Sequence, residues 1–216
     1  PRRGIENKVL FIYNLLKMNH CFFDLETLGA ERKFCDYYHC PMLFNIQETE
    51  EIKKIGDSLI TKSAKIGGKD KNNIRRGEVS WLPRTSEHLW VYNRLFKAIK
   101  KANDKLWKFE LNGFFEDCQY TTYKESLEGG DKYDFHLDFD GASGIHRKIS
   151  AVLQLTDESE YEGGNLELFP RTKPIIAPKK VGSITIFPSF MLHRVTEVTK
   201  GKRNSLVVWV SGYPFK

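Results

Sequence analysis

A histidine and an aspartate stand two residues apart in the segment Phe135–Phe139, where polar and apolar side chains alternate. Successive side chains of a β-strand point to opposite faces, so we expect His136 and Asp138 on one face and the three apolar residues packed on the other. An imidazole and a carboxylate side by side are two arms of a metal clamp. Taken alone, a His-x-Asp pair is more often a chance pair or a surface ion pair.

A third histidine strengthens the metal interpretation. His193 follows a predicted strand and a Pro-Ser turn, and Arg203 stands ten residues further on. Two histidines and one carboxylate form the ligand set that suits non-haem Fe(II) and leaves coordination positions open. His146 is a competing third ligand, but no arginine follows it at a suitable spacing for binding an anion.

Arg203 opens an apolar segment, and strand alternation places Ser205 and Trp209 on the same face as its side chain. An arginine that points into the interior is unfavourable unless it meets an anion. A dicarboxylate co-substrate supplies one, because a guanidinium can bind a carboxylate through two hydrogen bonds. The hydroxyl of Ser205 can add a third.

Strands must position these residues. From about Leu111 onward, segments rich in Val, Ile, Phe, Tyr and Thr alternate with Gly, Pro and Asp breakers, which is typical of short β-strands. The predicted strands are Cys118–Tyr123, Asp134–Phe139, Lys148–Leu155, Asn165–Phe169, Val181–Phe187 and Ser205–Val210.

Helices are expected before the strands. The segment Asn45–Glu48 has the form of a capping box, and apolar residues at helical spacing follow it. A second helix is predicted after Ser86 and is expected to end near Asn103. Its apolar stripe consists of Val91, Leu95, Ala98 and Ala102. Further upstream, Val9–Met18 is compatible with a short apolar helix and Tyr37–Phe44 with a short strand.

Helices first and many spaced strands afterwards predict a fold that is mainly β with supporting helices, built on a double-stranded β-helix (jelly-roll) core. We place one domain at residues 46–216. Residues 1–45 are expected to form an N-terminal extension that packs on or beside this core.

The run from Gln119 to Trp209 resembles the prolyl-4-hydroxylase-like 2-oxoglutarate/Fe(II)-dependent dioxygenases. Their pattern is a tyrosine strand, His-x-Asp, a Gly-Gly strand, and a histidine followed about ten residues later by a basic residue. The matching segments here are Gln119–Tyr123, His136–Asp138, Glu162–Phe169, and His193 with Gly201–Ser205. The resemblance covers Asn45–Asn112 only loosely and does not extend to the first 45 residues.

The resemblance implies that His136, Asp138 and His193 bind Fe(II). It assigns Arg203 to the distal carboxylate of 2-oxoglutarate, and Tyr123 matches a tyrosine that often adds a hydroxyl to the same carboxylate. The implied reaction uses O2, converts 2-oxoglutarate to succinate and CO2, and hydroxylates a substrate C–H bond. Ascorbate stays open as an additional reductant.

Three functions compete. The first is a hydroxylase of prolyl or other amino-acid residues in a peptide or protein, or of a free amino acid. The second is a nucleic-acid-modifying dioxygenase, which the net charge of +6 permits. That branch of the family carries a second arginine six residues after the first, whereas this chain has Trp209 there. We therefore expect a peptide, protein or amino-acid substrate and no nucleic-acid partner. The third is a binding module that keeps the fold without catalysis, which the intact ligand set argues against.

Composition limits the setting. Hydrophobic residues make up 40% of the chain and charged residues 29%, as in ordinary globular proteins. No apolar run reaches the roughly 20 residues of a membrane-spanning helix, so we expect no membrane association. The four cysteines are too few for a disulfide scaffold, which favours a reducing compartment and predicts a cytoplasmic protein. The spacing of Cys35, His39 and Cys40 matches no common zinc pattern. The oligomeric state is not predicted.

Overall fold

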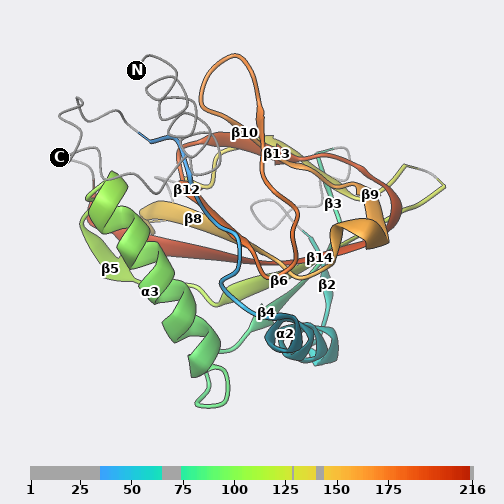
Figure 1. The fold of residues 1–216 in the computed structure, drawn as a ribbon, viewed down its shortest axis with the longest axis horizontal. Coiled ribbons are helices and arrows are strands. Elements are labelled where there is room, and N and C mark those ends of the chain that lie inside the picture. Colours follow the sequence, from blue (N-terminus) through green and yellow to red (C-terminus); the bar gives the residue numbers. More distant parts are fainter. Residues whose placement is uncertain (1–34, 65–73, 128, 140–143, 215–216) are drawn as a thin grey trace, which may run out of the picture.

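The structure, a computed structural model, describes residues 35–64, 74–127, 129–139 and 144–214 (Figure 1). The expected helix at Val9–Met18 lies outside the described residues. The helical elements are α2 (Ile46–Ser58), α3 (Leu89–Leu106) and the short 3-10 helix η1 (Glu158–Glu160). The first strands are β1 (Tyr38–Cys40), β2 (Lys62–Ser63), β3 (Arg75–Arg76), β4 (Glu78–Leu82), β5 (Leu111–Gly113), β6 (Cys118–Lys124) and β7 (Lys132–His136). The later strands are β8 (Arg147–Gln154), β9 (Tyr161–Gly163), β10 (Leu166–Phe169), β11 (Ile175–Ile176), β12 (Ile184–Pro188), β13 (Leu192–Val195) and β14 (Val198–Gly212).

The strands form two antiparallel sheets. The larger sheet has the order β1-β12-β8-β14-β6-β4-β2, with β5 and β9 paired to β14, and the smaller has the order β11-β10-β13-β7-β3. A buried cluster joins the two sheets, because Tyr123 and Val152 from the larger pack with Leu166 and Val195 from the smaller. The predicted jelly-roll fold with supporting helices is confirmed.

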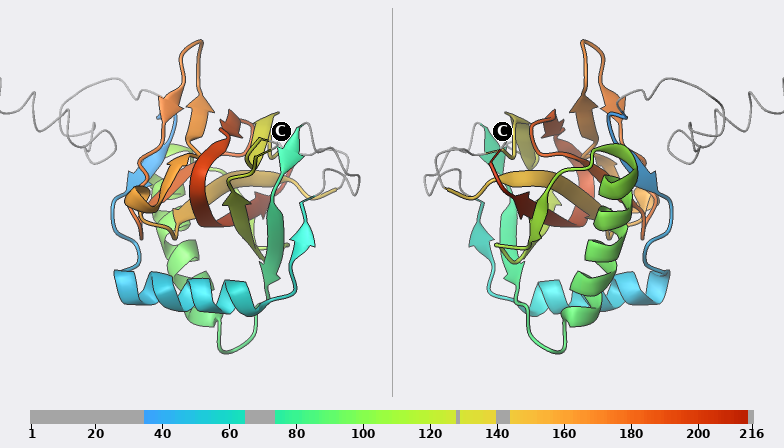
Figure 2. Two further views of the ribbon diagram at one scale, coloured as in Figure 1. Left: turned by 90° about the vertical axis from the view of Figure 1, so that its right-hand side faces the viewer. Right: turned by 90° about the vertical axis from the view of Figure 1, so that its left-hand side faces the viewer.

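The opposite face of the larger sheet is covered by α2 and α3 (Figures 1 and 2). Side chains alternate along β6, so Tyr120 packs toward the helices while its neighbours Gln119 and Thr121 face the smaller sheet. The larger hydrophobic cluster, which includes Leu95 and Ile99 of α3, fills this helix–sheet layer. The site is therefore confined to the inner layer, between the two sheets.

The sequence correctly predicts the capping box of α2, whereas the end and the apolar stripe of α3 differ from the prediction. Asn45 is the N-cap of α2, its Oδ1 accepts from the backbone N–H of Glu48 at 2.9 Å, and the Glu48 carboxylate accepts from the N–H of Asn45 at 2.9 Å. Helix α3 runs to Leu106, beyond the predicted end near Asn103, and its fully buried stripe uses Ile99 where Ala98 was expected. Steps of four from Leu95 lead to residue 99, which explains the stripe.

The predicted strand Asp134–Phe139 is wrong at its C-terminal end. Strand β7 ends at His136, and beyond it the N–H groups of Asp138 and Phe139 both donate to Ser189 O at 3.0 Å. The expected apolar packing of Phe135 and Leu137 also fails, because their exposed fractions are 46% and 50%. Phe135 still belongs to β7, on the face turned away from the cavity, whereas Leu137 already lies in the segment after the strand.

Among the described residues, no helix combines the length and the apolar character needed to cross a membrane. Within the described residues, Cys40 and Cys118 are free thiols.

Candidate active site

Three predicted ligands meet at one end of the smaller sheet. His136 and His193 lie opposite each other on β7 and β13, and Asp138 reaches them from the loop after β7. An Asp138 carboxylate oxygen lies 3.6 Å from His136 Nε2, and the other lies 3.4 Å from His193 Nε2. One potential ligand atom from each of the three residues lies within 4.8 Å of the other two. The described residues hold no other group of three such side chains.

Backbone carbonyls orient both imidazoles. His136 Nδ1 lies 2.7 Å from Asp134 O, and His193 Nδ1 lies 2.8 Å from Met191 O. A carbonyl only accepts, so each Nδ1 carries the proton and donates. In the neutral imidazoles the Nε2 atoms, which lie beside Asp138, are therefore the nitrogens available to a metal.

The charges of the cluster suit a divalent cation. Burial and the neighbouring His193 lower the pKa of His136 to about 4, which leaves this imidazole neutral at pH 7. Burial alone would raise the pKa of Asp138, but the two histidines and the Ser150 hydroxyl, which donates to Oδ2 at 2.7 Å, hold it well below its usual range. For His193, burial lowers the pKa, but the Asp138 carboxylate outweighs it and the net shift is upward. A carboxylate flanked by two imidazoles in a buried position is a complete facial ligand set.

The cluster opens into a cavity of about 390 Å³ between the sheets. Its floor is formed by inward residues of β6 and β14, among them the predicted Tyr123 and Ser205. Apolar side chains such as Val152 and Leu166 complete the walls. The structure therefore brings the predicted anion-binding residues into the same cavity as the three ligands.

Arg203 lies on the inner face of β14 with only 1% of its surface exposed. Its Nη2 donates to Gln154 Oε1 at 3.1 Å, whereas Nε and Nη1 have no hydrogen-bond acceptor within the described part of the chain. The Tyr123 ring, directly across the strand pair, lies 5.8 Å from the guanidinium carbon. A buried cation with two unused donors beside a cavity fits a carboxylate ligand, because the alternative is an uncompensated desolvation cost.

The Gly163-Gly164 turn has a structural reason. Gly164 has φ of +56°, and a Cβ at this position would come within 3.0 Å of Arg203 Cδ. The absence of a side chain lets the turn pack directly against the arginine, which links the Gly-Gly motif to the anion site.

Arg147, which belongs to none of the sequence motifs, lies in the cavity wall. Its guanidinium forms two hydrogen bonds to the Glu116 carboxylate, lies 4.0 Å over the Trp209 ring, and reaches the Asp138 carbonyl oxygen at 3.4 Å. The register between β8 and β14 shifts after Val210, so alternation does not hold at this end of β8. That irregularity turns Arg147 inward.

The sequence motifs miss other residues of the cavity. Arg75, Trp81, Glu116 and Tyr133 belong to no motif, yet all of them line the cavity. Gln119, the first residue of the tyrosine-strand motif, lines it as well. His39, His88 and His146 do not belong to the ligand cluster, and His20 lies outside the described residues.

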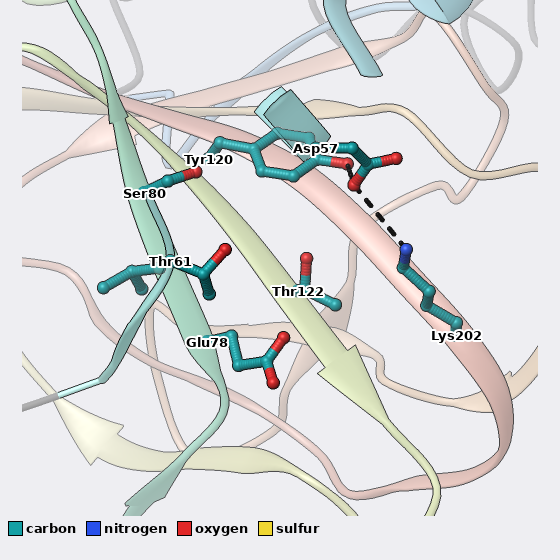
Figure 3. A pocket seen from close by; sticks show the side chains of 8 residues that line it. Asp57, Thr61, Glu78, Ser80, Tyr120, Thr122 and Lys202 are labelled. Atoms are coloured by element: carbon teal, nitrogen blue, oxygen red, sulfur yellow. Dashed lines mark hydrogen bonds and ion pairs between the residues drawn. The ribbon is translucent and has the colours of Figure 1, made fainter. Parts of the chain in front are cut away.

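A separate polar hollow lies under the C-terminal end of α2 (Figure 3). The Tyr120 hydroxyl donates to Asp57 at 2.8 Å, and Lys202 lies 3.6 Å from the same carboxylate. These groups bind one another and fasten α2 to the sheet, so we treat the hollow as structural.

A jelly roll with a buried two-histidine, one-carboxylate cluster defines the class of non-haem metal-site proteins of the double-stranded β-helix type. Residues 118–211 match the model of the 2OG-Fe(II) oxygenase superfamily. The predicted resemblance to the prolyl-4-hydroxylase-like members of this superfamily is confirmed over this part of the chain.

Curated proteins with similar sequences are PKHD-type hydroxylases. A PKHD-type hydroxylase of Synechococcus sp. (strain CC9311) is 41% identical over 90 residues, which cover 42% of this chain and 40% of the relative. One from Prochlorococcus marinus is 42% identical over 86 residues, covering 39% of this chain and 38% of the relative. The matched part thus spans about two fifths of the length of these relatives.

Solved structures share the fold. A Pseudomonas putida prolyl-4-hydroxylase superposes with a TM-score of 0.65 at 21% identity, covering 83% of this chain and 94% of that one. A Trichoplax adhaerens prolyl hydroxylase in complex with a hypoxia inducible factor peptide fragment gives a TM-score of 0.63 at 15% identity, covering 82% of this chain and 83% of that one.

Proposed function

We propose that this chain is a 2-oxoglutarate- and Fe(II)-dependent hydroxylase that acts on prolyl or other amino-acid residues of a peptide or protein. The observation that carries the proposal is the position of Arg203. A buried guanidinium with two unused donors shares one cavity with a two-histidine, one-carboxylate cluster. That pairing matches the two needs of this reaction, a metal and a dicarboxylate co-substrate.

In this proposal His136, Asp138 and His193 hold Fe(II), while Arg203 binds the distal carboxylate of 2-oxoglutarate with help from the hydroxyls of Tyr123 and Ser205. When bound, Fe(II) and 2-oxoglutarate supply the oxidising chemistry: O2 and 2-oxoglutarate yield succinate and CO2, and one oxygen atom enters the substrate C–H bond. The use of ascorbate is a further part of the proposal to be tested.

The protein's own residues prepare this chemistry. Ser150 holds the Asp138 carboxylate and is itself 3.0 Å from the Ser189 hydroxyl. Two backbone carbonyls fix the imidazole tautomers. Val152 and Leu166 give the cavity apolar walls, and an apolar surrounding strengthens the ion pair between Arg203 and a bound carboxylate.

Other residues that line the cavity support a peptide substrate. Trp81 and Trp209 lie 6.2 Å apart by ring centroids, and the Arg147–Glu116 pair closes the wall. An aromatic surface suits the apolar ring of a prolyl residue, and the paired charges can hydrogen-bond to peptide groups. The names of the relatives and the peptide in the Trichoplax complex support the same substrate class. Trp209 stands where a nucleic-acid demethylase would have its second arginine, so we do not favour that alternative.

The setting is proposed from the sequence. Four cysteines are too few for a disulfide scaffold, which favours a reducing, cytoplasmic environment. We keep the division into a domain at residues 46–216 and an extension at residues 1–45 as part of the proposal. Within that extension, β1 already pairs with β12 of the larger sheet.

The test is a turnover screen. Purified protein with Fe(II), 2-oxoglutarate and O2 should release succinate and add about 16 mass units, one oxygen atom, to at least one member of a proline-containing peptide library. An equal set of methylated single-stranded oligonucleotides serves as the competing substrate class. If only the oligonucleotides are oxidised, the peptide substrate is wrong and the nucleic-acid alternative takes its place. If neither class of substrate leads to succinate release, the proposal that the chain is an enzyme is wrong.

A further inference from the structure

The two histidines of the cluster are held in unequal surroundings. The His193 side chain is 5% exposed and packs in β13, between β10 and β7. The His136 side chain is 13% exposed and ends β7, which has only the two-residue strand β3 on its other side. Burial therefore constrains His136 less than His193, and something else must fix its ring.

A β-bulge supplies the neighbour that does this. The register pairs His136 with His193 but Tyr133 with Val195. Between these two pairs β7 advances by three residues while β13 advances by two. In a regular strand, residues three apart point to opposite faces. The extra residue turns both Tyr133 and His136 into the cavity, as bulges next to functional sites commonly do.

Two rings and one guanidinium group are stacked on one another. The Tyr133 ring lies parallel to the His136 imidazole, with centroids 3.5 Å apart and planes inclined by 12°. On Tyr133, the guanidinium carbon of Arg75 lies 4.4 Å from the ring centroid. Arg75 Nη2 in turn donates to Gln119 Oε1 at 2.8 Å, which fastens this stack to β6 of the larger sheet.

We propose that Arg75 and Tyr133 are positioning residues that fix the plane of the His136 imidazole for metal binding. The hydrogen bond from Nδ1 to Asp134 O fixes the tautomer but leaves the ring free to tilt about that bond. Stacking against Tyr133 removes the tilt, and Arg75, which is only 8% exposed, keeps the Tyr133 ring in place through a cation–π contact. The inference rests on the proposed metal site, but not on the substrate or on turnover.

The test measures metal binding directly. Metal-free protein is titrated with Mn(II), a redox-stable probe, and the unbound ion is followed by electron paramagnetic resonance. Changes to groups that orient a metal ligand commonly weaken metal binding by about tenfold to hundredfold, and we expect this range for Tyr133→Leu. Tyr133→Phe keeps the stacked ring and should bind like the wild type. Arg75→Met leaves Tyr133 present and should weaken binding by a smaller factor.

Phe135→Leu is the matched control. Phe135 lies on the same strand next to His136, but it faces outward and packs on Phe169 with centroids 5.0 Å apart. Equal weakening by Phe135→Leu and Tyr133→Leu would mean that β7 has merely loosened, and it would overturn the inference. Wild-type Mn(II) affinity in both Tyr133→Leu and Arg75→Met would do the same. If Tyr133→Leu does not fold, the comparison of Arg75→Met with Phe135→Leu decides. A wild type that binds Mn(II) but turns over no 2-oxoglutarate would defeat the proposed function while leaving this comparison intact.

Discussion

Replacing Arg203 with methionine should separate co-substrate binding from folding. Methionine keeps an unbranched, flexible stem but lacks the guanidinium group and its charge. In the ligand-free protein, Arg203 is a buried cation with one hydrogen bond, to Gln154, and two donors without acceptors in the described residues. Its desolvation costs several kcal/mol, whereas leaving Gln154 Oε1 without a donor costs about 1–3 kcal/mol. We therefore expect the ligand-free variant to be at least as stable as the wild type.

In contrast to its effect on stability, Arg203→Met should weaken the binding of 2-oxoglutarate strongly. Losing one partner of a buried, hydrogen-bonded ion pair costs about 3–5 kcal/mol. At about 1.4 kcal/mol per tenfold change, the 2-oxoglutarate requirement should rise by about two to three and a half orders of magnitude. Metal binding should persist, since Arg203 is no part of the ligand cluster.

Thermal unfolding with and without 2-oxoglutarate, together with succinate release over a range of 2-oxoglutarate concentrations, gives both quantities. Arg194→Met is the control, because Arg194 is a partly buried arginine paired with Glu167 at 2.7 Å that does not line the cavity. It should leave the co-substrate requirement unchanged. Unchanged 2-oxoglutarate dependence in Arg203→Met would refute the assignment, and a strong loss of ligand-free stability would refute the desolvation reasoning.

Further changes test the cluster and the fold. Asp138→Ala should abolish turnover with Fe(II) supplied, and any substantial succinate release by this variant would exclude the residue as a ligand. Gly56→Ala should lower the free energy of unfolding by about 1–2 kcal/mol in urea titrations, because the new Cβ would lie 2.5 Å from the Tyr120 ring and overpacking outweighs the gain of about 1 kcal/mol in helix propensity. Asn45→Ala should lower the free energy of unfolding by about 0.5–2 kcal/mol in the same assay, because it removes the N-cap of α2. A neutral result would show that packing alone determines where the helix begins. Burial raises the pKa of the Cys118 thiol to about 12, so at pH 8.5 (about the ordinary thiol pKa) iodoacetamide should leave Cys118 unlabelled until the protein is unfolded, as peptide mass spectrometry would reveal.

Local signals in the sequence were sufficient for much of the fold. The capping box at Asn45 works through contacts within four residues, so it could be read directly from the chain. Alternation correctly predicted that Arg203, Ser205 and Trp209 share the inner face of β14, because that stretch pairs regularly with its neighbours. The ordered motif by itself also predicts the resemblance to the 2-oxoglutarate/Fe(II)-dependent dioxygenases.

Tertiary structure decided the places where alternation breaks. Asp138 meets His136 through a loop held by Ser189, and Tyr133 stacks on His136 only because of a bulge. Arg147 turns inward at a second irregularity. A bulge depends on how two strands distant in sequence pair with each other, and a single chain read in order carries no local signal of it.

The residue types, their order and their periodicity therefore determined the class of fold, the candidate metal ligands and the arginine proposed to bind the co-substrate. Only the folded chain decided which additional side chains reach the cavity and how the ligands are held. Arg75 belongs to a two-residue strand without a motif, yet it lies over Tyr133 because β3 pairs with β7. The physical reason is that hydrophobic and capping patterns act over a few residues, whereas cavity walls are assembled from strands whose pairing is fixed by the packing of the whole domain.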